Sequence, residues 1–419
     1  MEKVATTLTR FTEWLNSYGE TSWDHQSFFA GPLGRRAKSC YYRYPKLGLM
    51  AVAPMIFFEA LLPAGRRLFH QRIRFPIADA HYAMAFAFLH QATEKKIYLE
   101  RAVHFLRVLQ KSRSPGFVEN CWGYPFDWVT RLGIVKEQTP LITTTPYVYE
   151  AFLQVNELQR QDEWTDILAS IARHVTTDIK DFDSSPTASS CSYTPFGEGG
   201  VLNAAAYRAF LLTSAARLFS KDTYATIARR NLNFVLENQN KDGSWYYATD
   251  QVRDFVDHYH TCFVMKALGK IYALTGDTRC YGALATGVEY YLKNLFDEEG
   301  LPKPFSKAPR LTVYKRELYD FAECVNLCLV LRKPFPQLGA TLQTVVSEVL
   351  TNWVKPDGSF RSRRLHVGWD NIPMHRWGQA QMFRSLAYYL SESMPEKTFR
   401  GLCSNAPDGA KEKAPLINV

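Results

Sequence analysis

Apolar residues recur at helical spacing along most of the chain. The first such segment spans residues 3–18, where one face is apolar: Val4, Leu8, Phe11 and Leu15. Residues 47–62 form a second predicted helix, bent at Pro54 because proline lacks a backbone donor and crowds the preceding turn. Residues 19–46 are rich in glycine, aromatic residues and arginine, and are predicted to be a loop.

From residue 78 onward the predicted helices come in pairs. The first helix, residues 78–93, is rich in alanine and apolar nearly all round, which is typical of a helix buried on several sides. Its partner, residues 98–111, is amphipathic. The later pairs and one final helix span residues 145–158 with 164–180, 203–219 with 223–238, 258–275 with 280–295, 319–331 with 338–353, and 375–391. This alternation indicates an inner ring of buried helices inside an outer ring of amphipathic ones.

Short related motifs leave the second helix of successive pairs. They are Ser114-Pro-Gly-Phe117, Asp181-Phe-Asp183, Asp242-Gly-Ser-Trp245, Asp297-Glu-Glu-Gly300 and Asp357-Gly-Ser-Phe360. Their period of about 60 residues accommodates two helices and two connections. With the N-terminal and last helices as a sixth pair, the sequence predicts an all-α (α/α)6 toroid with almost no sheet. Residues 1–393 form this single domain, and the polar residues 394–419 are predicted to be a disordered tail.

Loop length indicates where a site would lie. Long polar loops precede the inner helices, whereas short ones such as Thr275-Gly-Asp-Thr278 join an inner helix to its outer partner. The long loops must therefore gather at one rim of the toroid, over the N-termini of the inner helices. We expect a binding site at that rim.

Composition says little more about the fold, but it narrows the class of ligand. Aromatic residues make up 14% of the chain and can stack on flat faces such as sugar rings. The formal net charge of +9 suits either a solvated basic surface or an anionic partner. No secretory leader and no apolar run long enough to cross a bilayer are recognised. The eight cysteines form no CxxC pair or regular framework, so a reducing, cytoplasmic compartment is expected.

The first loop of the predicted rim, residues 121–131, surrounds a charged pair with aromatic residues. Trp122, Tyr124 and Trp128 are candidate stacking faces for a sugar ring. Asp127 would accept a sugar hydroxyl or act as acid or base. Alternatively, Asp127 and Arg131 form an internal salt bridge that holds the loop.

The second loop, residues 192–203, is rich in glycine, which permits close backbone approach. Its spacing does not match a dinucleotide-binding fingerprint and no strand precedes it. Tyr193 is a candidate ligand contact, and Asn203 is either another contact or the N-cap of the following helix.

The third motif joins Trp245, a candidate stacking residue, to titratable groups where a helix starts. Asp257 is either a ligand contact or a cap, and His258 and His260 are candidate catalytic bases. Two histidines that are two positions apart cannot share a helix face, so one should face the rim and the other should pack. The spacing lacks the i, i+4 histidine pair of a zinc helix, so neither a metal nor another cofactor is predicted.

The fourth motif, residues 307–323, carries cations and tyrosines. Arg310 and Arg316 can clamp a carboxylate, and Tyr314 is a candidate proton donor. Alternatively, the carboxylates of the same motif only neutralise these cations: Glu317, Asp320 and Glu323.

The fifth motif, residues 360–377, mixes arginine, histidine and tryptophan. Its candidate anion-binding residues are Arg361, Arg363 and Arg376, its stacking residue is Trp369, and its candidate acids and bases are Asp370 and His375. Packing of arginine on tryptophan is the competing structural explanation. Because arginine outnumbers carboxylates in this motif and the one before it, the sequence favours an anionic ligand.

Two resemblances extend these predictions. Gln239-Asn-Lys-Asp-Gly-Ser-Trp245 resembles the QW-type motif of terpene cyclases and prenyltransferase-like toroids. The DxDD motif of the cyclases is absent from the sequence, and the zinc set of the prenyltransferases is not evident in it. This resemblance therefore implies the toroid architecture rather than that chemistry.

Residues 72–390 look more like bacterial toroid proteins of polysaccharide gene clusters. The resemblance rests on CWGYPFDW, TPLITTTPYVYEAF, DGSWYYATDQVRDFVDHYHTCFVMKAL and HRWGQAQMFRSLAYYL. It implies a role in the biosynthesis or modification of a cell-surface polysaccharide. Uronyl epimerases and polysaccharide lyases with α/α toroids are similar in architecture, and they abstract a proton with Tyr or His beside a carboxylate held by Arg.

Three functions remain open on the sequence. The first is an enzyme that acts on an anionic, uronate-type glycan or its precursor by epimerisation, elimination or hydrolysis. The second is a terpene-cyclase-like or prenyltransferase-like enzyme, which requires an apolar central cavity. The third is a non-catalytic glycan-binding scaffold. The expected partners are an acidic saccharide and a polysaccharide assembly complex; no nucleic-acid partner is predicted.

Overall fold

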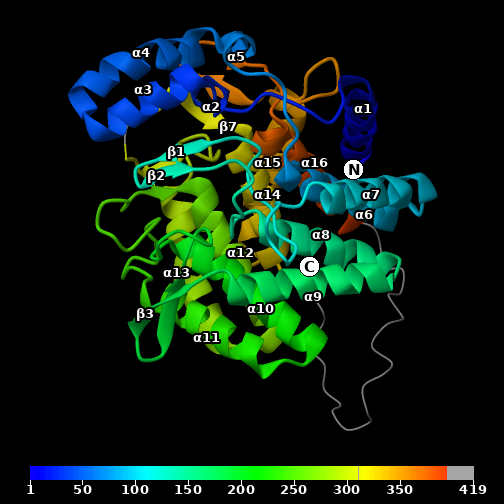
Figure 1. Ribbon diagram of the computed structural model, residues 1–419. Coiled ribbons are helices and arrows are strands. Elements are labelled where there is room, and N and C mark those ends of the chain that lie inside the picture. Colours follow the sequence, from blue (N-terminus) through cyan, green and yellow to red (C-terminus); the bar gives the residue numbers. More distant parts are fainter. Residues whose placement is uncertain (310, 394–419) are drawn as a thin grey trace.

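Six buried helices stand side by side around a common axis in the computed structural model, which describes residues 1–309 and 311–393 (Figure 1). They are α6 (Pro76–Thr93), α8 (Thr145–Leu158), α10 (Leu202–Phe219), α12 (His258–Thr275), α14 (Leu318–Leu331) and α16 (Ala380–Ser391). Each helix packs against the next, and α16 packs against α6, so the ring closes. Small residues such as Ala80, Ala83 and Ala87 of α6 let the helices approach closely on several sides.

A second ring surrounds the first. Its helices are α7 (Lys96–Lys111), α9 (Asp162–Thr177), α11 (Asp222–Glu237), α13 (Thr278–Asn294), α15 (Leu338–Glu348) and α1 (Glu2–Tyr18). Each buries one face only; in α7 that face consists of Ala102, Phe105, Leu106 and Leu109. The predicted (α/α)6 toroid is therefore confirmed, with α1 and α16 as the sixth pair. The predicted tail, residues 394–419, lies outside the described residues.

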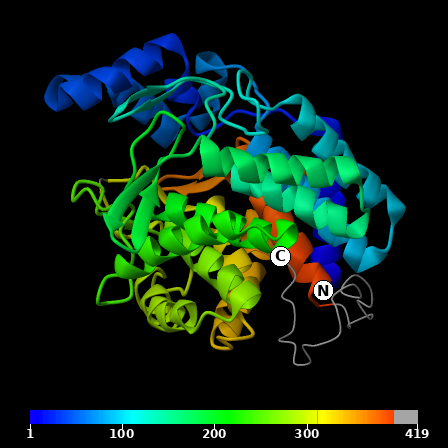
Figure 2. The ribbon, with the colours of Figure 1, turned by 60° about the horizontal axis from the view of Figure 1, so that its bottom comes forward.

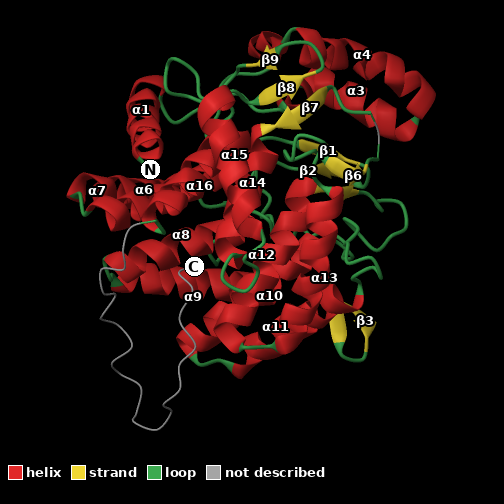
Figure 3. Cartoon of the chain, turned by 180° about the vertical axis from the view of Figure 1, so that it is seen from behind, coloured by secondary structure: helices red, strands yellow, loops and turns green. Residues whose placement is uncertain are grey.

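Short strands join the long loops at one rim. β1 (Trp128–Thr130) pairs with β2 (Gly133–Val135), and β3 (Asp181–Ser185) with β4 (Ala188–Cys191). β5 (Val256–Asp257) pairs with β6 (Phe305–Lys307), and β7 (Tyr314–Glu317), β8 (Arg363–Leu365) and β9 (Trp369–Asp370) form one sheet. Two of these pairings, β5–β6 and β7–β8, link loops that precede different inner helices, and Figure 3 shows the strands on one side of the molecule. The prediction that the long loops gather at one rim is thus confirmed.

Two of the repeated loop motifs adopt the same turn at equivalent places. Asp242 Oδ1 accepts hydrogen bonds from the backbone N–H of Ser244 at 3.0 Å and from its hydroxyl at 2.7 Å. Asp357 makes the same two bonds to Ser359, also at 3.0 and 2.7 Å. The glycine between them has a φ of 91° in both turns, a left-handed conformation that favours glycine. The motif is therefore a structural signature of the repeat.

Residues 19–46, predicted as a loop, contain two helices, so that prediction is wrong. They are α2 (Ser27–Ala30) and α3 (Pro32–Arg43), and α4 (Pro45–Leu61), η1 (Pro63–Gly65) and α5 (Arg66–Phe69) follow. This insert has a small core of its own, formed by Phe28, Ala37, Val52 and Met55. A glycine that suggested a loop allows close packing instead, since a Cβ on Gly34 would lie 2.1 Å from the Phe28 carbonyl oxygen.

The α3–α4 hairpin stands away from the two helical rings in both views (Figures 1 and 2). Within the described residues, no single helix combines the length and the apolar composition needed to cross a membrane. Pro45–Leu61 and Pro63–Phe69 pass that test only together, and they are bent by 120° at the break between them.

Candidate active site

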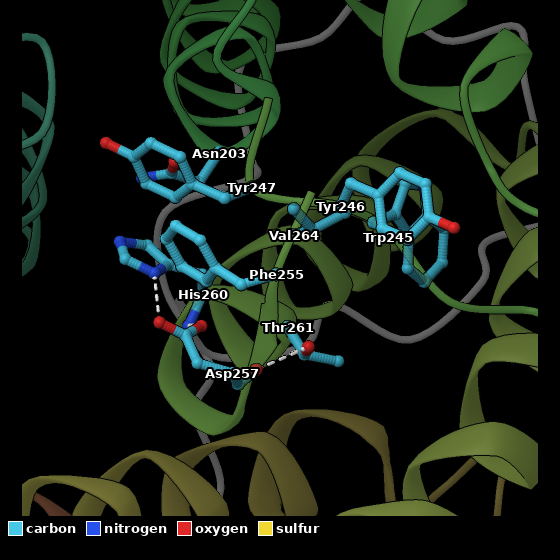
Figure 4. A pocket seen from close by; sticks show the side chains of 9 residues that line it. All are labelled: Asn203, Trp245, Tyr246, Tyr247, Phe255, Asp257, His260, Thr261 and Val264. Carbon is cyan, nitrogen blue, oxygen red and sulfur yellow. Dashed lines mark hydrogen bonds and ion pairs between the residues drawn. The ribbon is translucent and has the colours of Figure 1, made fainter. Parts of the chain in front are cut away.

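A small pocket lies at the rim beside the N-terminus of α12 (Figure 4). Its lining comes from the loop before α12 and from the first turns of α10 and α12: Asn203, Trp245, Tyr246, Tyr247, Phe255, Asp257, His260, Thr261 and Val264. Chain segments that are far apart in the sequence meet here because both inner helices start at the same rim.

An aspartate and a histidine form a hydrogen-bonded pair in the wall of this pocket. Asp257 is the N-cap of α12, and its Oδ1 accepts from the backbone N–H of His260 at 3.1 Å. Asp257 Oδ2 accepts from Nδ1–H of the same imidazole at 2.6 Å (Figure 4). Among the described residues nothing bonds to Nε2, and the side chain of His260 is 18% exposed. The carboxylate thus fixes the ring orientation and leaves Nε2 to accept a proton, the geometry of a general base.

Asn203 lines the same pocket with an unpartnered amide. The residue is buried, yet neither its Oδ1 nor its Nδ2 has a hydrogen-bond partner among the described residues. The N-cap of α10 is Val201 and no side chain caps this helix, so capping by Asn203 is not observed. Buried amides are nearly always hydrogen-bonded, which marks this one as a candidate ligand contact.

Half-buried aromatic side chains surround the mouth of the toroid, and we call them the aromatic collar: Tyr124, Trp128, Tyr193, Tyr247, Tyr259 and Trp377. Neighbouring ring centroids are 5.8 Å apart for Tyr124 and Trp128, 6.0 Å for Trp128 and Tyr193, and 5.4 Å for Tyr259 and Trp377. The His260 ring lies between Tyr247 and Tyr259, at 4.6 and 4.4 Å. Such a collar offers flat faces on which a sugar ring can stack around the base.

Arg376 closes the collar between Trp377 and Tyr124. Its guanidinium lies 5.2 Å from the Trp377 ring centroid and 4.5 Å from that of Tyr124. Asp24 holds it with two hydrogen bonds of 3.0 and 2.6 Å. His25, which no sequence pattern singled out, packs on Trp377 at 4.1 Å.

Ionisable residues of the inner helices lie below the collar, and we call them the axial cluster: His81, Glu150, Lys266, Lys270, Glu323 and Arg384. Each lies on one of the inner helices and is buried. Glu150 accepts from Lys270 at 2.7 Å and from Arg384 at 3.2 Å, and Lys266 forms an ion pair with Glu323. Glu323 Oε1 and His81 Nε2 have no partner among the described residues. A polar axis of this kind does not fit the apolar cavity of a prenyl-binding enzyme.

Most of this cluster was not predicted from the sequence. The signal that was available is a single charge in the middle of an otherwise apolar helix, as with Glu150 in Thr145–Leu158. Buried charges are rare and need partners, so such a residue indicates a polar neighbour across the ring.

Asp320 lies one turn above Glu323 on α14 and is fully buried. Neither carboxyl oxygen has a hydrogen-bond partner among the described residues. Burial raises the pKa of Asp320 well above its usual value, and the nearby carboxylates Glu317 and Asp257 raise it further. Both effects favour the protonated form of Asp320, which makes this carboxyl group a candidate proton donor. The expected neutralisation of loop cations by Asp320 is not observed.

The two other candidate histidines are buried and fully bonded. His258 bonds to the Leu295 carbonyl at 3.2 Å and to the Tyr291 hydroxyl at 2.8 Å. His375 accepts from the Tyr82 hydroxyl at 2.5 Å and donates to the Gly19 carbonyl at 3.0 Å. Burial lowers the pKa of each to about 3. Of the histidine pair on α12, His260 faces the pocket and His258 packs, the division that their spacing predicted.

Because His258 is buried, we expect the stability difference between the wild type and a His258 variant to depend on pH. The unfolded chain protonates this imidazole below about pH 6.5 and the folded chain does not, so acid removes stability that is present at neutral pH. His258→Gln should be less stable than the wild type at about pH 7. That gap should shrink by up to about 1.4 kcal/mol per pH unit below about pH 6.5. Urea unfolding between about pH 7 and about pH 4 measures the gap, and a constant gap would contradict the prediction.

Protein carboxylates neutralise several of the predicted anion-binding arginines. Arg316 pairs with Asp297 at 2.5 Å and Glu299 at 3.0 Å, and Arg363 pairs with Glu317 at 3.1 Å and Glu59 at 2.7 Å. These carboxylates come from other loops and from the insert, which the sequence could not place. Arg310 lies outside the described residues.

Packing explains other residues of the fourth and fifth motifs. Arg361 lies over Trp369 at 4.9 Å, as the structural alternative expected, and Arg363 lies over Tyr314 at 4.5 Å. Asp370 is fully buried and accepts from Arg66 at 2.6 Å. Arg376 is the predicted anion-binding residue of the fifth motif that contacts the collar.

Two predicted stacking residues and one predicted ion pair have structural roles. Trp122 and Trp245 are buried, and their indole N–H groups donate to carbonyls of the preceding outer helices, at 2.9 and 3.0 Å. Asp127 pairs with Arg35 of α3 at 2.7 Å instead of the neighbouring Arg131, so the proposed internal salt bridge is wrong. The helix that supplies Arg35 lies in the segment that was predicted to be a loop.

Comparison with known proteins identifies the fold. No family model matches the chain, and no curated protein matches it in sequence. Among solved structures, it is similar to an unsaturated glucuronyl hydrolase specific for heparin, with a TM-score of 0.62 and 10% identity over 93% of this chain and 96% of that one. A cellobiose 2-epimerase from Bacillus thermoamylovorans gives a TM-score of 0.61 and 10% identity over 76% and 88%. A polysaccharide lyase gives a TM-score of 0.55 and 10% identity over 81% and 98%. At these identities the likeness concerns the fold alone.

Proposed function

We propose that this chain is an enzyme that acts on an anionic, uronate-type glycan or its precursor by epimerisation, elimination or hydrolysis. The observation that carries the proposal is the Asp257–His260 pair, set beside the unpartnered amide of Asn203 and inside the aromatic collar. This combination supplies a base, a hydroxyl-binding group and stacking surfaces in one place.

Each group has a defined role in the proposal. A sugar ring stacks on the collar, and Asn203 binds one of its hydroxyls. His260 Nε2 removes the proton from the carbon beside the sugar carboxylate, and Asp257 stabilises the imidazolium that forms. Arg376 stabilises the negative charge that develops on the carboxylate. Asp320, the buried acid, is the candidate donor for the returning proton or the leaving oxygen.

Similar folds support this choice of reaction class. The compared structures are named as an epimerase, a lyase and a glucuronyl hydrolase, which match the three reaction types of the proposed function. In a toroid the inner-helix N-termini meet at one rim, so different proton-transfer reactions can use the same position.

A neutral reducing sugar is the second candidate substrate. The observation that favours it is the bidentate ion pair between Asp24 and Arg376, which already neutralises the guanidinium of the collar. One protein of similar fold, the cellobiose 2-epimerase, is named for a neutral reducing sugar. In this version the base acts on the carbon beside the sugar carbonyl.

Exchange of substrate hydrogen with solvent tests both versions. The purified chain is incubated in deuterated water with polymers of glucuronate, galacturonate and mannuronate, and separately with neutral reducing disaccharides. Incorporated deuterium is read by mass spectrometry, unsaturated uronate by its ultraviolet absorbance, and new reducing ends by a colorimetric assay. Deuterium or unsaturation in a uronate polymer supports the anionic substrate, and exchange in the disaccharides alone supports the neutral one. A complete lack of exchange, unsaturation and cleavage would contradict the proposal.

The cellular setting belongs to the same proposal. The seven cysteines in the described part of the chain are free, which is compatible with a reducing cytoplasmic compartment. We infer that the protein works there on a surface polysaccharide, alongside an assembly complex that elongates or exports it.

A further inference from the structure

The outward face of α4 is apolar and exposed. Met50, Phe57 and Leu61 follow one another at i, i+7 and i+11, so they share one face of the helix, and they are 75%, 53% and 52% exposed. Other exposed apolar residues lie in the same segment of the chain: Leu47, Leu49, Leu62 and Leu68. We call this surface the apolar face of the hairpin.

This face is unusual within the same molecule. The outer-ring helix α7, for comparison, turns mainly charged residues outward, among them Glu100, Arg107 and Lys111. α4 contains only two charged residues, Lys46 and Glu59, and Glu59 is bound to Arg363. A large exposed apolar patch marks a surface that binds a partner or a membrane.

The hairpin is a well-packed element, so the face is not exposed by loose folding. Gly48 brings α4 against α3 with no room for a side chain. Val52 and Met55 fill the small core on the opposite side of α4. The helix therefore presents the apolar face outward as a fixed feature of the fold.

Exposed cations belong to the same insert as this face. Residues 27–69 contain seven Lys and Arg residues and a single carboxylate, Glu59. Two of the seven, Arg35 and Arg66, form ion pairs with the rim residues Asp127 and Asp370. Four of the others are exposed: Arg36, Arg43, Lys46 and Arg67.

We propose that the α3–α4 hairpin binds the surface of an anionic lipid bilayer, with the apolar face of the hairpin inserted among the lipids and Arg36, Arg43, Lys46 and Arg67 at the headgroup phosphates. Apolar residues flanked by Lys and Arg are the chemistry of an interfacial helix. A second copy of the chain is a poorer occupant, because two such faces would bring two positively charged inserts together.

The way the hairpin is attached to the toroid would fix the orientation of the protein on the lipid surface. The pairs Arg35–Asp127, Arg66–Asp370 and Arg363–Glu59 connect the insert to loops of the rim, at 2.7, 2.6 and 2.7 Å. Docking through α4 would therefore hold the rim beside the lipid surface. Lipid binding is independent of the proposed reaction, since its test measures binding and not turnover.

Flotation of the full-length chain with lipid vesicles tests the proposal. We expect it to float with vesicles of phosphatidylcholine mixed with phosphatidylglycerol, to float much less with phosphatidylcholine alone, and to be released by salt. M50D combined with F57D should abolish flotation. R43S combined with K46S should weaken it several-fold and reduce its salt dependence. The matched control is V118D, which places the same charge at an exposed apolar residue outside the hairpin, 92% exposed, and should float as the wild type does.

Three results would overturn the proposal. They are no flotation with the anionic vesicles, flotation that M50D with F57D leaves unchanged, and a wild-type dimer in solution that the same substitutions convert to a monomer. The last would assign the face to a second copy of the chain. Circular dichroism and thermal melting of every variant confirm that a lost interaction is not a lost fold.

Discussion

Replacement of His260 by alanine is expected to lower turnover by about 10²–10⁴-fold, the usual contribution of a positioned general base. The loss should appear in kcat, because the collar that binds the sugar is unchanged. Asp257→Asn should also reduce turnover, since its amide can no longer stabilise the imidazolium. The measurement is the initial rate on whichever substrate shows exchange or cleavage.

His104→Ala is the matched control for this experiment. His104 lies on the outer helix α7, is 44% exposed, pairs with Glu20 and does not line the pocket. Its removal should leave the rate unchanged. If His260→Ala keeps full activity while the enzyme remains folded, the base lies elsewhere and the proposed mechanism is wrong.

Glu150→Ala is expected to destabilise the fold by about 3–5 kcal/mol, the usual effect of breaking a buried ion pair from one side. Glu150 is the shared acceptor of Lys270 and Arg384, and all three side chains are buried. Without the carboxylate, two cations remain inside the ring with no compensating charge. Chemical denaturation monitored by circular dichroism measures the difference.

Two further variants make the stability result specific. Glu157→Ala removes an exposed carboxylate from the same helix and should change stability by no more than about 0.5 kcal/mol. Adding Lys270→Met to Glu150→Ala should recover part of the loss, because one of the two uncompensated cations is gone. Equal effects of Glu150→Ala and Glu157→Ala would show that the axial cluster contributes little to stability.

The architecture could be predicted from the sequence because it depends on local patterns. The alanine-rich segment around Ala83 and the one-sided pattern around Phe105 each determine how many faces of a helix must be buried. Alternation of the two kinds leaves a double ring as the simple solution, and the unequal loops then place the rim. The insert escaped prediction because the glycines of residues 19–46, such as Gly34, were interpreted as loop signals, whereas Gly34 packs closely against the Phe28 backbone.

The candidate site was predictable only in part. A spacing of two was enough to state that His258 and His260 face different ways, because helical geometry is local. Which of them faces the pocket depends on Leu295 and Tyr291, which lie more than thirty residues away and bury His258.

Charge was the least predictable property. The surplus of arginine in the last two motifs is a real feature of the sequence, but its meaning depends on partners from other loops. Asp24 holds Arg376 and Glu59 holds Arg363, across separations of 352 and 304 residues. An ion pair is decided by distance in space, and no periodicity along the chain encodes such a distance.

The sequence by itself therefore determined the double ring of helices, the rim over the inner-helix N-termini and the residue types available there, because these follow from periodicity and loop length. Only the tertiary structure decided that His260 is held by Asp257, that Asn203 has no partner among the described residues, that the axis is charged and that α4 presents an apolar face to the outside. Each of these depends on which side chains the closed ring brings together or leaves uncovered. The physical reason is that burial and pairing belong to the assembled helices and not to any one of them.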